Sequence, residues 1–168
     1  MQSRVIKGTS LLRGSGATAL LVAGALALGI GTAQAGGCPV DKMVQSGNGQ
    51  PQSSAAAKGV TDTVLASSNL AQEPVGIHDR QFRLRKLVVE PGGVVPWHSH
   101  ADRPAIIYIV EGEITEYAST CAVPIVHRAG EATAETHATA HWWKNTSDKP
   151  AVLISADLFK VQDDPHMM

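Results

Sequence analysis

The sequence of 168 residues lacks any long helical period, any apolar run of membrane-spanning length and any broad basic stripe. Without a helical period, short β-rich segments are the main structural signal. The longest apolar stretch, residues 17–30, is shorter than the roughly 20 residues that an ordinary membrane helix needs. A basic stripe or arginine cluster is the usual mark of a protein that binds nucleic acid. We therefore expect no nucleic-acid partner and no stable membrane span.

One short basic segment requires separate treatment, because Arg83 and Arg85 alternate with Phe82 and Leu84. Side chains of successive strand residues point to opposite faces, so this alternation is typical of a strand. A basic strand face is most simply explained by contact with solvent. We predict a strand here whose arginines are exposed.

The first 35 residues have the pattern of a secretory signal peptide. Arg4, Lys7 and Arg13 precede the apolar stretch, and Ala33-Gln34-Ala35 offers a cleavage site with small residues. Cleavage after Ala35 would remove three of the 14 basic residues and none of the 15 acidic ones, changing the net charge from −1 to −4. We predict a protein exported to the periplasm or secreted. An alternative is a lipoprotein acylated at Cys38, although the large aliphatic residue usual before such a cysteine is missing.

The chain has only two cysteines, Cys38 and Cys121. Export would place them in a compartment where a disulfide persists, and a bridge would attach the mature N-terminus to the domain. The alternative is two unpaired thiols. Because disulfide geometry cannot be derived from sequence, both remain open.

Composition divides the mature chain into two parts. Residues 36–59 are rich in Gly, Ser, Gln, Ala and Pro and are predicted to be a flexible linker. Residues 60–168 are predicted to form one domain. Turn residues separate its predicted strands, which are 60–66, 81–90, 105–111, 113–117, 123–128, the segment around His141, and 151–160. Many short strands in one domain favour an antiparallel sandwich or barrel.

The histidines His98, His100 and His141 are the strongest functional signal. On a strand, residues i and i+2 point to the same face, so His98 and His100 can present both rings to one ion. His141 would complete the site from another strand. Neutral imidazole is a common ligand of Zn, Cu, Fe and Ni, so the three residues predict a metal site.

The spacing around these histidines resembles the two motifs of the cupin family. Gly92, five residues, His98-Ser99-His100, four residues, Ala105, six residues and Gly112 fit the first motif, except that alanine replaces its glutamate. Gly130, five residues, Thr136-His137-Ala138, two residues, His141, three residues and Asn145 fit the ends of the second motif, although its Pro-x-Gly turn is absent. The resemblance covers roughly residues 80 to 160.

The resemblance implies an all-β fold, a double-sheet, jelly-roll-like cupin barrel with a metal in its mouth. His98, His100 and His141 map onto ligand positions, whereas Ala105 cannot supply the family's carboxylate. A site of three imidazoles favours a later first-row divalent ion, here Fe, Cu, Ni or Zn. Cupins commonly form dimers through their sheets, so the resemblance also implies a homodimer.

Several other residues are candidates for the site. His137 and Asp102 are candidates for a fourth ligand or for a supporting contact, with an ordinary surface position as the alternative. Strand alternation predicts a pocket lined by Trp143, Ala105, Ile107 and Ile109, and Arg103 at the rim is a candidate to receive a ligand carboxylate.

The leading hypothesis is an exported, metal-dependent cupin that binds a small organic molecule at a three-histidine centre. Cupin dioxygenases look similar in their use of three histidines and iron, so oxygenation is one activity; lyase and isomerase chemistry are others. One rival is a periplasmic cupin that binds or senses a small molecule without turnover. Another is a metal-free structural barrel. Scaffold alone decides among none of these.

Overall fold

The structure, a computed structural model, describes residues 36–161; the predicted signal peptide therefore lies outside the described residues. Within residues 36–161 there are eight strands and two short 3-10 turns, and no α-helix. No helix in the described part is long and apolar enough to cross a membrane. The elements are η1 (Val40–Lys42), β1 (Lys58–Asn69), η2 (Leu70–Gln72), β2 (Arg80–Ser99), β3 (Ala105–Glu111), β4 (Glu113–Ala118), β5 (Ile125–Arg128), β6 (Ala132–Glu135), β7 (Ala140–Lys144) and β8 (Ala151–Lys160).

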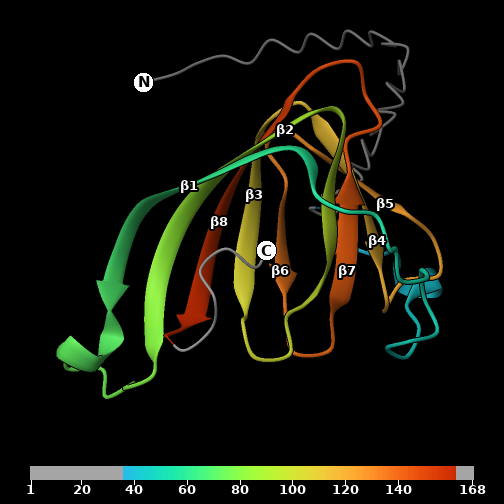
Figure 1. Ribbon diagram of the computed structural model, residues 1–168. Helices are drawn as coiled ribbons and strands as arrows, with labels where there is room; N and C mark the ends of the chain where they lie inside the picture. The colour runs from blue at the N-terminus through green and yellow to red at the C-terminus, as the bar shows by residue number, and fades with distance from the viewer. Residues whose placement is uncertain (1–35, 162–168) are drawn as a thin grey trace, which may run out of the picture. The chain divides into compact units, whose positions relative to one another are not determined.

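The strands form one antiparallel, barrel-shaped sheet that is nearly closed (Figure 1). Their order is β5-β4-β7-β2-β8-β3-β6, and β1 pairs with β2 outside this path. Part of the interior is filled by apolar side chains that alternate with outward ones, such as Ile107 and Ile109 of β3. The prediction of an all-β barrel is thus confirmed. β6 was not among the predicted strands.

β2 is the longest strand, and it turns from one wall of the barrel to the other. Its residues 80–89 pair with β8, whereas residues between Val94 and Ser99 pair with β7. Between these parts, Gly92 has a φ of +72°, and a Cβ on Gly93 would lie 2.7 Å from the backbone oxygen of Glu90. Glycine is needed at both positions for these reasons. Pro91-Gly92-Gly93 was expected to end a strand, but it bends a continuous one and carries it to His98.

The arginines of β2 face the interior, which is the reverse of the sequence prediction. Arg83 is 5% exposed and Arg85 is 8% exposed, whereas Phe82 and Leu84 are 49% and 38% exposed. Two hydrogen bonds of 3.0 and 2.7 Å join the Arg83 guanidinium to the carboxylate of Asp157 on β8. A buried guanidinium is tolerated where such a partner satisfies it. The predicted solvent-exposed basic face is therefore wrong in phase, although the strand itself is present.

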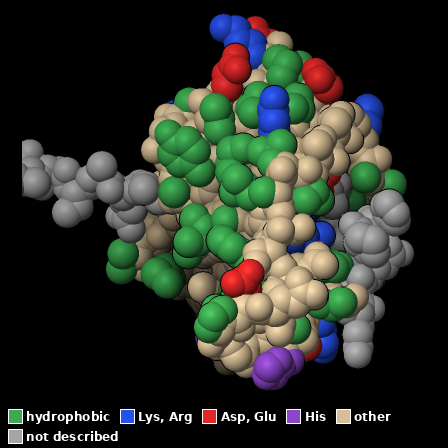
Figure 2. Space-filling model, turned by 90° about the vertical axis from the view of Figure 1, so that its left-hand side faces the viewer, with side chains coloured by type: hydrophobic (Ala, Val, Ile, Leu, Met, Phe, Trp, Pro, Cys, Tyr) green, Lys and Arg blue, Asp and Glu red, His purple; other side chains and the backbone are tan. Residues whose placement is uncertain are grey.

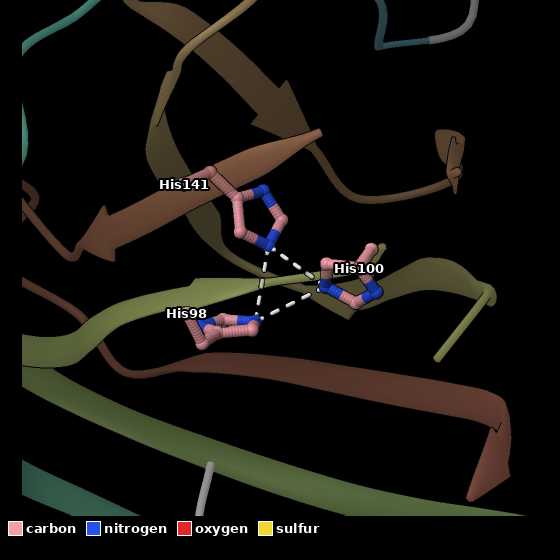
Figure 3. Close-up of side chains that lie close together, drawn as sticks. All are labelled: His98, His100 and His141. Carbon is pink, nitrogen blue, oxygen red and sulfur yellow. Dashed lines mark hydrogen bonds between the residues drawn. The ribbon is translucent and has the colours of Figure 1, made fainter. Parts of the chain in front are cut away.

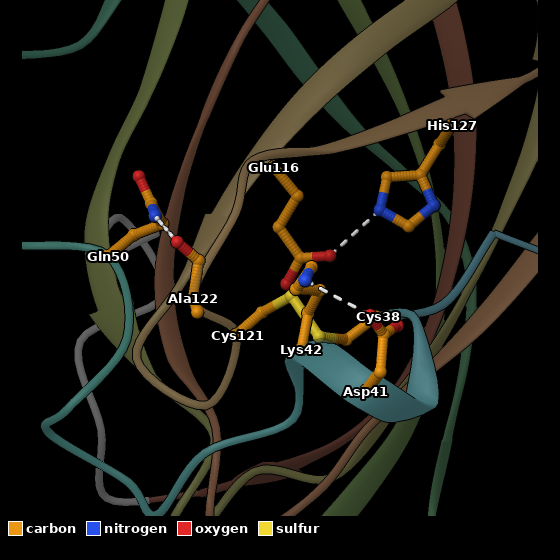
Figure 4. Close-up of a disulfide and its surroundings, with 8 residues drawn as sticks. All are labelled: Cys38, Asp41, Lys42, Gln50, Glu116, Cys121, Ala122 and His127. Carbon is orange, nitrogen blue, oxygen red and sulfur yellow. Dashed lines mark hydrogen bonds and ion pairs between the residues drawn. A yellow bond between two sulfur atoms is a disulfide. The ribbon is translucent and has the colours of Figure 1, made fainter.

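The segment before β1, predicted as a flexible linker, is held against the barrel over its first part. Cys38 and Cys121 form a disulfide, and Met43 pairs with Cys121 in an isolated β-bridge. Gln50 Nε2 donates a 2.8 Å hydrogen bond to the backbone oxygen of Ala122 (Figure 4). These contacts attach the segment to the turn that follows β4. Composition carries no signal for them, since the disulfide and the Gln50 hydrogen bond join residues that are 83 and 72 positions apart.

Candidate metal centre

His98, His100 and His141 converge at one end of the barrel (Figure 3). His98 lies near the end of β2, His100 follows this strand, and His141 on β7 is the register partner of His98. Their Nε2 atoms are 3.1 Å apart for His98 and His100, 3.0 Å for His100 and His141, and 3.1 Å for His98 and His141. The structure thus brings together the three residues expected to bind a metal.

The hydrogen bonds of the other ring nitrogens determine which tautomer each histidine adopts. In all three rings Nδ1 lies 2.6–2.9 Å from an oxygen that can only accept. The acceptors are the backbone oxygens of Pro96 and Arg103 and the carboxylate of Glu116. Each Nδ1 must therefore donate, which leaves a lone pair on each Nε2 in the neutral ring. The three lone pairs face one another, and the Trp143 indole N–H approaches only that of His141, at 3.3 Å. A cation is the group that satisfies all three.

The spacing and protonation of the rings fit a divalent metal ion. Metal–imidazole bonds of about 2.1 Å at right angles would place neighbouring nitrogens roughly 3.0 Å apart, close to the separations described above. Burial and the nearby His141 ring hold the pKa of His98 well below its usual range and lower the pKa of His100 to about 4. Both rings are therefore neutral near pH 7, as metal binding requires.

Glu116 contacts the Nδ1 side of the His141 ring and was not identified from the sequence. It lies on β4, is 2% exposed, and accepts hydrogen bonds from His141 Nδ1 at 2.6 Å and His127 Nε2 at 2.8 Å. Burial favours its neutral form, but the two hydrogen bonds outweigh burial and lower the pKa of Glu116. A carboxylate on Nδ1 orients a histidine ligand and raises its basicity. The available signal was alternation, which places Glu116 in phase with the apolar Ile114.

A second acidic group lies on the same side of His141. Glu135 on β6 is 2% exposed, and its Oε2 is 3.5 Å from His141 Nδ1. Burial, together with the neighbouring Glu116, raises the pKa of Glu135 to about 7. Glu116, Glu135 and His141 form a second group able to hold a metal ion. Of the two groups, the three histidines fit an ion better, because Nδ1 of His141 is already engaged by Glu116.

A cavity of about 40 Å³ adjoins the three histidines. Trp143, Ile107 and Arg103, which the sequence places at the pocket, line it. Ala105 and Ile109 are buried in the core but do not line it. The remaining walls are apolar, except for two polar residues that sequence analysis missed. These are Arg85 and Ser155.

The two other ligand candidates are not brought to the histidines. Asp102 has a side chain that is 59% exposed and forms ion pairs with Arg80 at 2.5 Å and Lys160 at 3.2 Å. His137 is exposed in the turn between β6 and β7. The groups that could hold a metal among the described residues contain neither of them.

Comparison with known proteins agrees with this architecture. Residues 85–157 match the family model of the cupin domain, Cupin_2, which spans both sets of histidines. Together with the barrel described above, this match identifies residues 85–157 as a cupin domain. The chain departs from the family motif at Ala105, where the first motif has a glutamate.

Individual relatives are distant. Nectarin-1 from Nicotiana langsdorffii x Nicotiana sanderae is 29% identical over 97 residues, which are 56% of this chain and 42% of nectarin-1. This chain therefore spans less than half the length of that relative. Among solved structures, an oxalate oxidase in complex with the substrate analogue glycolate has a TM-score of 0.46 and 21% identity, covering 59% of this chain and 50% of that one. KdgF from Halomonas sp. has a TM-score of 0.48 and 16% identity, covering 61% and 82%.

Proposed function

We propose that the protein is an exported cupin that binds Fe, Cu, Ni or Zn through His98, His100 and His141 and a small organic ligand beside that ion. The observation that carries the proposal is the set of three Nε2 lone pairs directed at one another within 3.1 Å. No carboxylate belongs to this ligand set. Because the ion's charge is then uncompensated, a site of imidazoles favours later first-row metals over magnesium or calcium.

We propose further that the bound ligand is oxidised, cleaved or isomerised. When bound, such an ion supplies Lewis acidity and, for iron or copper, a centre for oxygen chemistry. Glu116 keeps the proton on His141 Nδ1, so that Nε2 stays a donor to the ion. The apolar walls formed by Leu87, Val95 and Leu153 exclude bulk water from the cavity.

A second candidate is a cupin that binds or senses its ligand without turnover. Its supporting observation is that the described residues lining the cavity include no aspartate or glutamate that could act as a general base there. The two candidates differ in product formation. Incubation of the metal-loaded protein with its ligand, followed by mass spectrometry, separates them.

Export is supported by the disulfide between Cys38 and Cys121, because disulfides persist mainly in oxidising compartments. A sulfur held in a disulfide cannot carry a lipid, which argues against the lipoprotein alternative. Cell fractionation and N-terminal sequencing test the proposal. We expect a periplasmic or secreted chain that begins at Gly36, and an uncleaved cytoplasmic chain would contradict it.

We also propose a homodimer formed through the outer face of the sheet. Apolar side chains gather on the side of the molecule shown in Figure 2. Phe82 on β2 is 49% exposed, and Ile106 and Tyr108 on β3 are 59% and 46% exposed. Strand β8 lies between β2 and β3. Such patches are typical of interaction sites. Analytical ultracentrifugation should give a dimer that Ile106→Lys dissociates, whereas Val75→Lys, a change outside the sheet, should have no effect; a monomeric starting protein would contradict the proposal.

Metal analysis tests the central proposal. Mature protein purified without chelators should contain close to one transition-metal ion per chain by elemental analysis. His98→Ala and His141→Ala should lose it. His137→Ala is the matched control, because it removes a nearby histidine that is exposed, and it should retain the metal. Equal metal content in all variants, or no uptake on titration of the starting protein, would overturn the proposal.

A further inference from the structure

The cavity beside the histidines is lined by two residues that each have one buried polar atom without a hydrogen-bond partner among the described residues. Arg85 is 8% exposed and Ser155 is 1% exposed. Arg85 Nε and Ser155 Oγ both lack a hydrogen-bond partner, and both residues line the cavity. An unsatisfied buried donor destabilises the folded state, so two of them in one cavity require an explanation.

These two groups are neighbours across adjacent strands. Arg85 of β2 and Ser155 of β8 are register partners, and Ile107 of β3 follows in the same row. Directly opposed residues have Cβ atoms about 5 Å apart, so their side chains can reach one small group between them. The next row, Leu87 and Leu153, is apolar. On the other side, the row of Arg83 and Asp157 is charged, so Arg85 and Ser155 lie where the charged part of the interior meets the apolar part.

The surroundings of Arg85 and Ser155 favour an anion. Three guanidinium groups converge on the single carboxylate of Asp157. The separations are 2.7 Å for Arg83 Nη2, 3.5 Å for Arg85 Nη2 and 4.0 Å for Arg103 Nε. Arg85 Nη1 also contacts Asp62. These contacts fix the Arg85 guanidinium in place while leaving its Nε–H unpaired, so the donor is already oriented for a ligand.

We propose that Arg85 and Ser155 bind the carboxylate of a short organic acid, whose remaining part lies against the three histidines. One carboxylate accepts hydrogen bonds from both Arg85 Nε and Ser155 Oγ, which satisfies the two unpaired donors with one group. The cavity of about 40 Å³ has room for roughly three water-sized groups, so the acid is short. This assignment of ligand class rests on the proposed metal-dependent function.

Calorimetric titration of the full mature protein with glycolate tests the assignment, with glycolamide as the neutral analogue of the same size. Glycolate should bind the metal-loaded protein at least about tenfold more tightly than glycolamide, as expected for hydrogen bonds to a charged group. Ser155→Ala and Arg85→Lys should each reduce glycolate affinity several-fold and leave metal content unchanged. The matched control is Arg80→Lys, on the same strand but outside the cavity, which should bind glycolate normally.

The outcomes separate the subsite from the metal centre. If metal content is normal but glycolate and glycolamide bind equally, the carboxylate subsite alone is overturned. It is also overturned if Ser155→Ala and Arg85→Lys bind glycolate like the starting protein. If no metal binds, the proposed function fails, and the same titration of the metal-free protein decides the subsite. Binding of glycolate that depends on Arg85 and Ser155 then supports it, and absence of binding overturns it. Ser155→Ala should fold even if Arg85→Lys does not, because it removes only a hydroxyl that has no hydrogen-bond partner.

Discussion

Replacement of Asp157 by asparagine should be among the most destabilising conservative changes in this barrel. The Asp157 side chain is 0% exposed and is the carboxylate on which three guanidinium groups converge. Asparagine has nearly the same size, so no cavity forms. It removes the negative charge, however, and turns one acceptor oxygen of the Arg83 pair into an N–H donor that faces other donors.

The expected loss follows from burial. Removing one partner of a buried ion pair costs about 3–5 kcal/mol, because the remaining charge stays in a medium of low polarity. Asp102→Asn is the matched control, since Asp102 also pairs with two basic residues but is 59% exposed. Exposed pairs of this kind contribute less than about 1 kcal/mol. The same chemical change should therefore differ several-fold in effect between the two positions.

Urea unfolding of the metal-free, disulfide-intact protein, followed by circular dichroism, measures the free energy of unfolding of both variants, and heating measures their Tm. For a domain of this size the expected losses correspond to a decrease in Tm of roughly 10–20 °C for Asp157→Asn and under about 5 °C for Asp102→Asn. If Asp157→Asn is no less stable than Asp102→Asn, the interior arginines do not depend on this carboxylate, and the account of the charged interior is refuted.

Three further predictions concern the metal-free protein, the ligand shell and the disulfide. In the metal-free protein, burial lowers the pKa of both His98 and His100, so the unfolded chain protonates both rings below about pH 6.5 while the folded chain keeps them neutral. Folded Glu135, whose pKa burial raises to about 7, retains one proton more than the unfolded chain, which offsets only one of these two protons. The free energy of unfolding should therefore decrease as the pH falls below about 6.5, and a flat profile in urea titrations would contradict this. Glu116→Gln should weaken metal binding by about 10- to 100-fold, because a neutral amide replaces the carboxylate that accepts the hydrogen bond from His141. Competition with a chromophoric chelator measures the affinity, and an unchanged value would exclude this role of Glu116. Reduction of the disulfide, which closes a loop of 83 residues, should lower the free energy of unfolding by about 3–5 kcal/mol in calorimetry, and an unchanged Tm would show that the loop is held by other contacts.

The convergence of the three histidines could be predicted from sequence because two signals coincide there. Strand alternation puts His98 and His100 on one face, and the motif spacing brings His141 to the same place. Most strands were also predictable, because turn residues separate them. The bend at Pro91-Gly92-Gly93 was not, since glycines that end a strand and glycines that bend one look alike.

The charged interior could not be predicted, for a physical reason. Alternation gives the period of a strand but not its phase, so the sequence around Arg83 and Phe82 fits either face equally well. Hydropathy favours the apolar residues inside. The structure has the opposite phase because Asp157, 74 residues away, neutralises the arginines on the inner face. The role of Glu116 could not be predicted for a similar reason, since its partner His141 lies 25 residues further along the chain.

The pairing of Arg83 with Asp157 also affects the order in which the chain can fold. β2 lies early in the domain, and its buried Arg83 pairs with a carboxylate of β8, a later strand that pairs with both β2 and β3. During synthesis the chain emerges from its N-terminus, so β2 is complete long before the counter-charge of Arg83 exists. Until then the Arg83 guanidinium is better solvated by water than enclosed by protein. Closure of the barrel must therefore await the final ten-residue strand, and a chain that stops before residue 151 has an interior that it cannot bury.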